Sequence, residues 1–298
     1  MEQYKNTHVN QASYYFITYG DGDYSIQRKR ISFQAKKFEI FKKVLVYKKS
    51  SLSKDFKKRY ANLLLNPRGS GFWIWKSQII LQTFEKMNKN DILIYVDSGS
   101  TLNLKGKKRL IEYFEILNSS SKSLMLFEMD GNIEKCWTSS QIFEYFDVQN
   151  DKNITDSNQY MGGIILSKYN DESKKFFQDF QEAVDRDNNL ITDFYLPNQG
   201  NYFKACRHDQ SILSVMGKIN NCLSIKDESY YFENPNDQYS SPILTVRDGK
   251  YNIWQKLKFY FLYPINIRKE IYFKEKPFYF KNKQTVYRKI YSKFFNKF

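Results

Sequence analysis

Hydrophobic and polar positions follow two spacings along this chain, one typical of buried strands and the other of helices. Continuous apolar runs predict strands at 13–18, 44–47, 91–96, 124–127 and 161–166. Apolar residues three and four positions apart predict helices over 28–43, 73–87, 105–117, 173–188 and 211–219. Because the strands alternate with helices, the pattern favours an α/β fold built on one doubly wound sheet.

The run DILIYV at 91–96 is the most strongly apolar of these strands, which is typical of a central strand covered on both faces. Ligands of open α/β sheets bind beyond the carboxyl ends of such strands. Asp97 follows this strand directly, so we expect its carboxylate to face a ligand. One or two carboxylates suffice to hold a hard divalent cation against substrate phosphates. The alternative is that Asp97 only caps the loop that follows.

Charge is distributed unevenly along the 298 residues. The formal net charge of +15 implies an anionic partner, and 41% hydrophobic residues with 27% charged residues indicate a folded chain. Residues 251–298 contain twelve Lys and Arg against two Glu, a difference of +10. We therefore predict two parts, a catalytic domain at 1–245 and a basic, aromatic tail at 246–298.

The end of the tail has the pattern of an amphipathic helix. Its apolar stripe consists of Tyr287, Ile290, Tyr291, Phe294, Phe295 and Phe298. Basic residues occupy the other positions, so we expect the tail to lie on an anionic membrane surface. The alternative is a helix packed on the catalytic domain. No nucleic-acid motif accompanies the basic residues, so no nucleic-acid partner is expected.

Three blocks of the sequence resemble those of bacterial surface-polysaccharide glycosyltransferases. They are RGSGFWIWK at 68–76, DILIYVDSG at 91–99 and CRHDQS at 206–211. The resemblance extends from about Tyr14 to Glu233. It implies a GT-A fold, a Rossmann-like domain with a single mixed sheet flanked by helices, and a nucleotide-sugar donor.

The resemblance also implies Mn²⁺ or Mg²⁺, held by an Asp-x-Asp motif. Here the motif is Asp97-Ser98-Gly99, with one carboxylate instead of two, which puts metal dependence in question. The family suggests that a late histidine, His208, completes the metal shell with Asp97. Asp209 is our candidate for the general base that deprotonates the acceptor, although it could instead cap the helix that follows.

Other residues are candidates for donor binding. Cations that could neutralise the diphosphate are Arg30, Arg68 and Lys76, and nucleoside contacts are expected from Thr18 and Asp21. Ser98, Gly99, Gly162 and Gly163 would line the donor site. Simpler interpretations are surface positions for Arg30 and Lys76, turn chemistry for Asp21 and a β-bulge for the two glycines.

Together these features predict a hexosyltransferase that moves a sugar, expected to be UDP-linked, to a growing and lipid-linked surface glycan. Without a signal peptide or a long apolar run, we expect it in the cytoplasm, on the inner face of the membrane. The alternatives are a non-catalytic membrane or nucleic-acid binding module, and a nucleotidyltransferase, which would release pyrophosphate.

Overall fold

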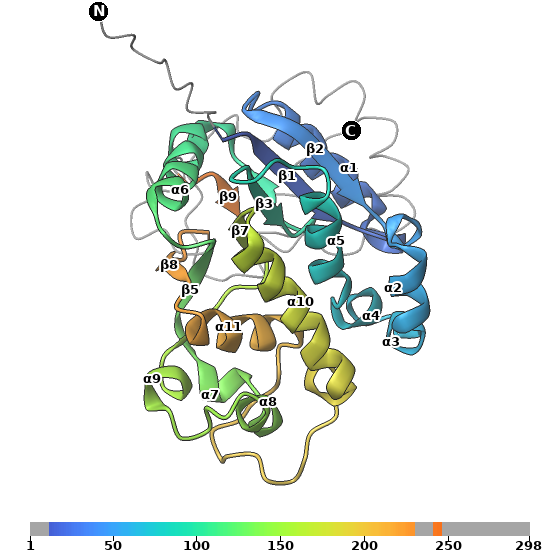
Figure 1. Ribbon diagram of the computed structural model, residues 1–298, viewed down its shortest axis with the longest axis vertical. Coiled ribbons are helices and arrows are strands. Elements are labelled where there is room, and N and C mark those ends of the chain that lie inside the picture. The colour runs from blue at the N-terminus through green and yellow to red at the C-terminus, as the bar shows by residue number, and fades with distance from the viewer. Residues whose placement is uncertain (1–11, 230–240, 246–298) are drawn as a thin grey trace, which may run out of the picture.

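The computed structural model describes residues 12–229 and 241–245 (Figure 1). The predicted membrane-binding tail at 246–298 lies outside these residues. None of the helices in the described ranges has the length and apolarity needed to span a bilayer.

Seven of the described strands form one sheet. They are β1 (Tyr14–Tyr19), β2 (Phe41–Tyr47), β3 (Ile92–Val96), β5 (Leu124–Ile133), β6 (Asn158–Tyr160), β7 (Ile164–Lys168) and β8 (Leu223–Lys226). The order is β2-β1-β3-β7-β5-β6, and β8 pairs with β5. β1 is parallel to β2 and β3, whereas β7 is antiparallel to both of its neighbours, β3 and β5. A single mixed sheet flanked by helices confirms the predicted fold class.

Helices cover both faces of this sheet (Figure 1). Side chains that alternate along β1 and β3 point to opposite faces, so each strand contributes to two apolar cores. On one face pack α5 (Trp75–Phe84), α10 (Asp171–Arg186) and α11 (Asp209–Ile219). On the other pack α1 (Ser25–Lys36) and α6 (Lys107–Ser119). Burial of β3 on both faces explains its continuous apolar run.

Shorter elements complete the described part of the chain. The remaining helices are α2 (Lys54–Arg59), α3 (Ala61–Leu65), α4 (Gly69–Phe72), α7 (Glu134–Trp137), α8 (Ser140–Tyr145) and α9 (Lys152–Thr155). Two further strands, β4 (Thr101–Leu102) and β9 (Ile243–Leu244), pair with each other beside the loop that follows β3.

Several expected elements differ from those observed, among them the strand predicted over 161–166, which is β7 at Ile164–Lys168, so that Gly162 and Gly163 precede the strand. The helix predicted over 28–43 ends at Lys36, because Glu39 turns with a φ of +54° and Phe41 begins β2 opposite Tyr14. The apolar spacing of Phe38 and Phe41 fits a helix, but Phe41 pairs in the sheet instead. The helix predicted from residue 73 begins at Trp75, after a left-handed turn.

Candidate functional site

Three strand ends meet at one edge of the sheet. β1 and β3 are parallel and end here, and β7 begins here because it runs in the opposite direction. Asp97, directly after β3, therefore lies beside Gly163, directly before β7. The Asp97 amide donates a hydrogen bond to the Gly163 carbonyl at 2.9 Å. The antiparallel direction of β7 thus brings the predicted glycines to the predicted carboxylate.

Lys76 links the charged residues at this edge. Its side chain, in the first turn of α5, is only 6% exposed. The ammonium donates to the Gly162 carbonyl at 2.7 Å and to the Asp209 carboxylate, and it lies 3.9 Å from Asp97 Oδ1. Lys76 is therefore not a solvated helix residue. Most of its hydrogen-bonding capacity is used within the protein, so we assign it to holding the two carboxylates together rather than to direct diphosphate binding.

Asp209 is the buried carboxylate of this group. It is the first residue of α11, and His208, not Asp209, occupies the N-cap position. Its side chain pairs with Lys76. Burial raises its pKa to about 6, although Lys76 acts to lower that pKa, and nearby Asp97 raises it further. The carboxyl group therefore changes charge near neutral pH, as a general base requires, but it does so inside the protein.

Asp97 is the carboxylate that reaches solvent, with 39% of its side chain exposed. The hydroxyl of buried Tyr95 donates to its Oδ1. Sequence reasoning missed Tyr95, although the two-residue spacing along β3 places it on the same face as Asp97. We refer to Lys76, Tyr95, Asp97 and Asp209 as the edge cluster. It combines one cation, one exposed carboxylate and one buried carboxylate.

Two residues expected to contact the donor are instead buried beneath the loop at 97–100. The Thr18 hydroxyl donates to the Val96 carbonyl at 2.8 Å. The Arg30 guanidinium donates to the carbonyls of Ser98 and Ser100 at 3.2 and 2.6 Å. Both side chains are almost completely buried, which contradicts the surface alternative for Arg30 and favours a supporting role for both residues over direct ligand contact. They position the loop that carries Asp97.

Replacing Arg30 with Met is expected to destabilise this loop. The substitution keeps most of the apolar stem but leaves two buried carbonyls without their donor, which costs roughly 1–3 kcal/mol. We expect a lower midpoint in urea denaturation and a lower turnover. The conservative control is Lys29→Met, an exposed neighbour on the same helix. An equal stability for the two variants would contradict this role for Arg30.

A left-handed turn precedes Lys76. Gly69, Ser70, Gly71, Phe72 and Trp73 all have φ between +52° and +103°. For the residues with a Cβ atom this conformation costs roughly 1–2 kcal/mol each. The turn is held in part by the Trp75 indole, which donates to the Gly69 carbonyl at 2.8 Å. Strain of this kind persists where the surrounding structure enforces it, which is common at functional sites.

His208 packs against this turn. Its ring lies 5.4 Å from the Trp73 ring, in a stacked arrangement. Nε2 accepts from Arg68 Nε at 2.8 Å, and Nδ1 is 2.9 Å from the Ile191 carbonyl, to which it donates. Burial lowers the pKa of His208, which favours the neutral ring that these contacts require. Arg68 itself is 55% exposed and also lies 3.5 Å from Asp193.

This arrangement does not fit a divalent ion held by Asp97 and His208. Both ring nitrogens of His208 already have protein partners, and Asp97 Oδ1 accepts from Tyr95 beside the Lys76 ammonium. Within residues 12–229 and 241–245, no three His, Cys, Asp or Glu side chains gather in a metal-binding group. We therefore assign no reaction step to a metal, and metal dependence stays a prediction for assay.

The predicted glycines allow close packing at the edge cluster. A Cβ atom on Gly162 would lie 2.9 Å from the Gln210 Cβ, and one on Gly163 would lie 3.1 Å from Asp97 Oδ2. Neither distance leaves room for a side chain without movement. Of the other donor-site candidates, Ser98 is buried, whereas Gly99 and Asp21 are half-buried at the ends of β3 and β1.

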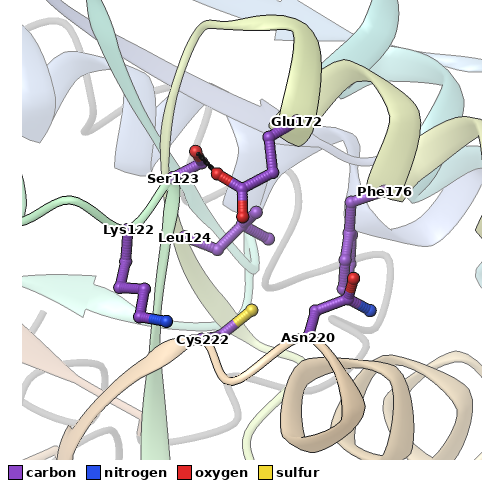
Figure 2. Close-up of a pocket in the computed structure, with 7 residues that line it drawn as sticks. All are labelled: Lys122, Ser123, Leu124, Glu172, Phe176, Asn220 and Cys222. Carbon is purple, nitrogen blue, oxygen red and sulfur yellow. Dashed lines mark hydrogen bonds between the residues drawn. The ribbon is translucent and has the colours of Figure 1, made fainter.

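Two hollows in the described residues lie apart from the edge cluster. One lies at the opposite edge of the sheet, between the start of β5 and α10, and Figure 2 shows its lining residues. Its volume of about 10 Å³ has room for about one water molecule. The other has about 500 Å³ and is lined by Ser53, Asp55, Phe56, Lys58, Arg59, Gln78 and Gln181. Neither contains a residue of the edge cluster.

No protein-family profile matches the sequence, and no curated protein matches it. Solved structures do match. A glycosyltransferase involved in glycosylation of the major capsid of PBCV-1 is 10% identical, with 78% of this chain and 93% of that chain covered and a TM-score of 0.44. Mouse xyloside xylosyltransferase 1 is 8% identical, with 82% and 99% covered and a TM-score of 0.43. A Bacillus anthracis protein described as a glucose-1-phosphate thymidylyltransferase is 10% identical, with 72% and 87% covered and a TM-score of 0.35.

Proposed function

We propose that this chain is a glycosyltransferase that transfers a sugar from a nucleotide-diphosphate donor to a hydroxyl group of a glycan. The observation that carries the proposal is the edge cluster, in which Lys76 links exposed Asp97 to buried Asp209. Ligands of α/β sheets bind at this edge, beyond the carboxyl ends of the parallel strands. Sugar transfer to a hydroxyl group requires a group that receives the hydroxyl proton, and a carboxylate at this position can receive it.

The exposed carboxylate is the better candidate for contact with the reacting atoms. In the proposed reaction, the acceptor oxygen forms a bond to the anomeric carbon while the bond from that carbon to the diphosphate oxygen breaks. The acceptor proton goes to Asp97, and the diphosphate leaves with the bonding electrons. Asp209 is too buried to meet an acceptor directly, so we assign it, through Lys76, to setting the position of Asp97.

Arg68 supplies a cation for the departing diphosphate. The Nε of its guanidinium donates to His208 and lies 3.5 Å from Asp193, and its side chain is largely exposed. The two terminal guanidinium nitrogens suit paired phosphate oxygens. His208 would then fix the orientation of Arg68 instead of binding a metal. This role keeps Arg68 in the donor site and moves His208 into a supporting position.

The phosphate-containing product that is released distinguishes a glycosyltransferase from a nucleotidyltransferase. We suggest incubating the full chain with UDP-glucose, UDP-galactose, UDP-N-acetylglucosamine and GDP-mannose, with and without Mn²⁺. Transfer or slow hydrolysis would release a nucleoside diphosphate, whereas a nucleotidyltransferase given a sugar phosphate and a nucleoside triphosphate would release pyrophosphate. Neither binding nor turnover with any donor would overturn the proposal and favour a non-catalytic binding module.

We further propose a UDP-linked donor and a lipid-linked surface glycan as acceptor, with the enzyme on the cytoplasmic face of the membrane. These finer assignments rest on the sequence. The tail pattern supports them, because a basic amphipathic segment would bring the enzyme to an acceptor held in anionic lipid. Sugar transfer and membrane docking would then be separable properties of residues 1–245 and 246–298.

Deleting residues 286–298 is expected to weaken membrane binding without affecting transfer to a soluble acceptor. The deletion removes four Lys or Arg residues, each worth about 1 kcal/mol near an anionic surface, together with the apolar stripe. Sedimentation with vesicles of phosphatidylglycerol and phosphatidylcholine measures the loss, and neutral vesicles are the control. Undiminished binding to the anionic vesicles would reject the role of the tail.

A further inference from the structure

The larger of the two hollows, between α2, α5 and α10, takes no part in the proposed reaction (Figure 1). Its volume of about 500 Å³ falls within the range of small-molecule binding sites. α5 connects it to the edge cluster, because Lys76 and Gln78 belong to the same helix. Two residues along a helix are turned by about 200°, so the hollow and the edge cluster lie on different sides of α5. A ligand unit in the hollow would therefore leave the edge cluster free.

Two amide side chains that line the hollow belong to a hydrogen-bonded network. Gln181 Nε2 donates to Ser77 Oγ and to Gln78 Oε1, both at 3.2 Å. Gln78 Nε2 in turn donates to Ser53 Oγ at 3.2 Å and to Gln82 Oε1 at 3.1 Å. These bonds connect α10 and α5 to the N-cap of α2. The polar lining is therefore held in place before a ligand binds.

One atom of this network lacks a partner among the described residues. Gln181 Oε1 accepts no hydrogen bond from them, although the whole residue is only 7% exposed. Polar groups buried to this extent nearly always have a partner, so this oxygen indicates a bound group in the hollow. Ser53 Oγ accepts from the Phe56 amide and from Gln78, and within the described residues it donates to none, so its hydrogen is available to a ligand. The hollow thus presents one acceptor and one donor from fixed side chains.

Charged side chains around the hollow balance each other. Asp55 and Lys58 are exposed, and neither side chain has a partner in the part of the chain that the structure describes. Arg59 donates to Asp185 at 2.8 Å. The formal charges of these four side chains sum to zero, which disfavours an anionic ligand. Phe56 is the one apolar residue among the described residues that line the hollow, and it is itself buried, which disfavours an acyl chain.

We propose that this hollow binds a neutral sugar unit of the glycan acceptor, at a distance from the hydroxyl group that receives the new sugar. Sugar hydroxyls both donate and accept, so they match Gln181 Oε1, Ser53 Oγ and the balanced charges around them. An ionised phosphodiester has no hydrogen to donate to Gln181 Oε1. The inference rests on the proposed function and deepens it, because it gives the enzyme a second contact with its glycan on another side of α5.

Asp55→Ala combined with Lys58→Ala tests the proposal. The double variant removes two side chains that have no partner among the described residues and keeps the net charge, so thermal stability should stay close to that of the wild type. Gln181→Met removes the buried acceptor, with some loss of stability because two hydrogen bonds within the protein are lost as well. Lys54→Ala, exposed on the same helix but outside the hollow, is the control.

Saturation-transfer NMR with the full chain measures binding of maltohexaose, cellohexaose, mannohexaose and chitohexaose, and of hexaguluronate as an anionic probe. We expect at least one neutral hexasaccharide to bind, about 5- to 20-fold more weakly in both hollow variants and unchanged in Lys54→Ala. Release of nucleoside diphosphate from the donor alone should be the same in the wild type and in the Asp55→Ala, Lys58→Ala double variant.

Three results would overturn the inference. They are no binding of any neutral probe, equal binding by the wild type and the hollow variants, and a preference for hexaguluronate that the hollow variants abolish. Wild-type protein that releases no nucleoside diphosphate from any donor would instead overturn the proposed function itself.

Discussion

Replacing Asp97 with Asn is expected to lower turnover about 10²- to 10⁴-fold, the usual contribution of a side chain that transfers a proton in the rate-limiting step. Asn keeps an oxygen that can accept from Tyr95, so the end of β3 should keep its conformation. The change removes only the charge and the basicity of the carboxylate. Release of nucleoside diphosphate under saturating donor measures the effect.

Thermal stability should be nearly unchanged in Asp97→Asn. The side chain is partly exposed, and the loss of its charge removes two opposing effects, an attraction to Lys76 and a repulsion that acts on buried Asp209. Asp171→Asn, at the start of α10 near the opposite edge of the sheet, is the control for a generic loss of surface charge. Full turnover by Asp97→Asn would exclude the proposed role, and unfolding of this variant would make Asp97 a structural residue.

Replacing Lys76 with Met is expected to have the largest effect on stability. The variant leaves the Asp209 carboxylate buried without its cation, and breaking a buried pair in this way costs about 3–5 kcal/mol. Turnover should fall as well, because Asp97 loses its link to Asp209. Adding Asp209→Asn should recover much of the stability but not the turnover. Urea denaturation of the four proteins in this cycle at pH 8 measures the coupling between the two side chains.

The stability lost in the Lys76→Met variant should be larger at high pH than at low pH. In the wild-type protein the pKa of Asp209 is about 6, above the ordinary value of 3.8, so the folded state holds its proton to a higher pH than the unfolded chain does. Its contribution to the free energy of unfolding therefore falls as the pH rises from about 4 to 6. Without Lys76 the pKa rises further, and the Lys76→Met variant should be less destabilised at pH 5 than at pH 8. An equal loss at both pH values would contradict this electrostatic explanation.

The backbone at the site was partly predictable from the sequence. The continuous apolar run before Asp97 predicted a strand buried on both faces, and the structure has this strand. Because Asp97 follows the run directly, the sequence also predicted a carboxylate at this edge of the sheet. The position of Gly162 and Gly163 beside Asp97 depends on the direction of β7, and an apolar run does not reveal direction. The left-handed turn at 69–73 likewise depends on contacts with Trp75 and His208 that no local pattern contains.

Side-chain roles were harder to predict, because they depend on burial and on partners distant in the sequence. Arg30 falls within a helical pattern that fits a surface position equally well, yet it is buried under the loop at 97–100. Lys76 and Asp209 are 133 residues apart and meet only in the folded chain. Tyr95 is an aromatic residue within a strand, where the usual expectation is packing. Only the hydrogen bond from its hydroxyl to Asp97 singles it out.

Amide hydrogen exchange with and without the tightest donor of the panel tests the location of the site most directly. If the edge cluster and its neighbours bind the donor, protection should increase in peptides that cover residues 95–100, 161–165 and 207–212. Protection confined to the 500 Å³ hollow between α2, α5 and α10, or no change in any peptide at saturating donor, would contradict this account.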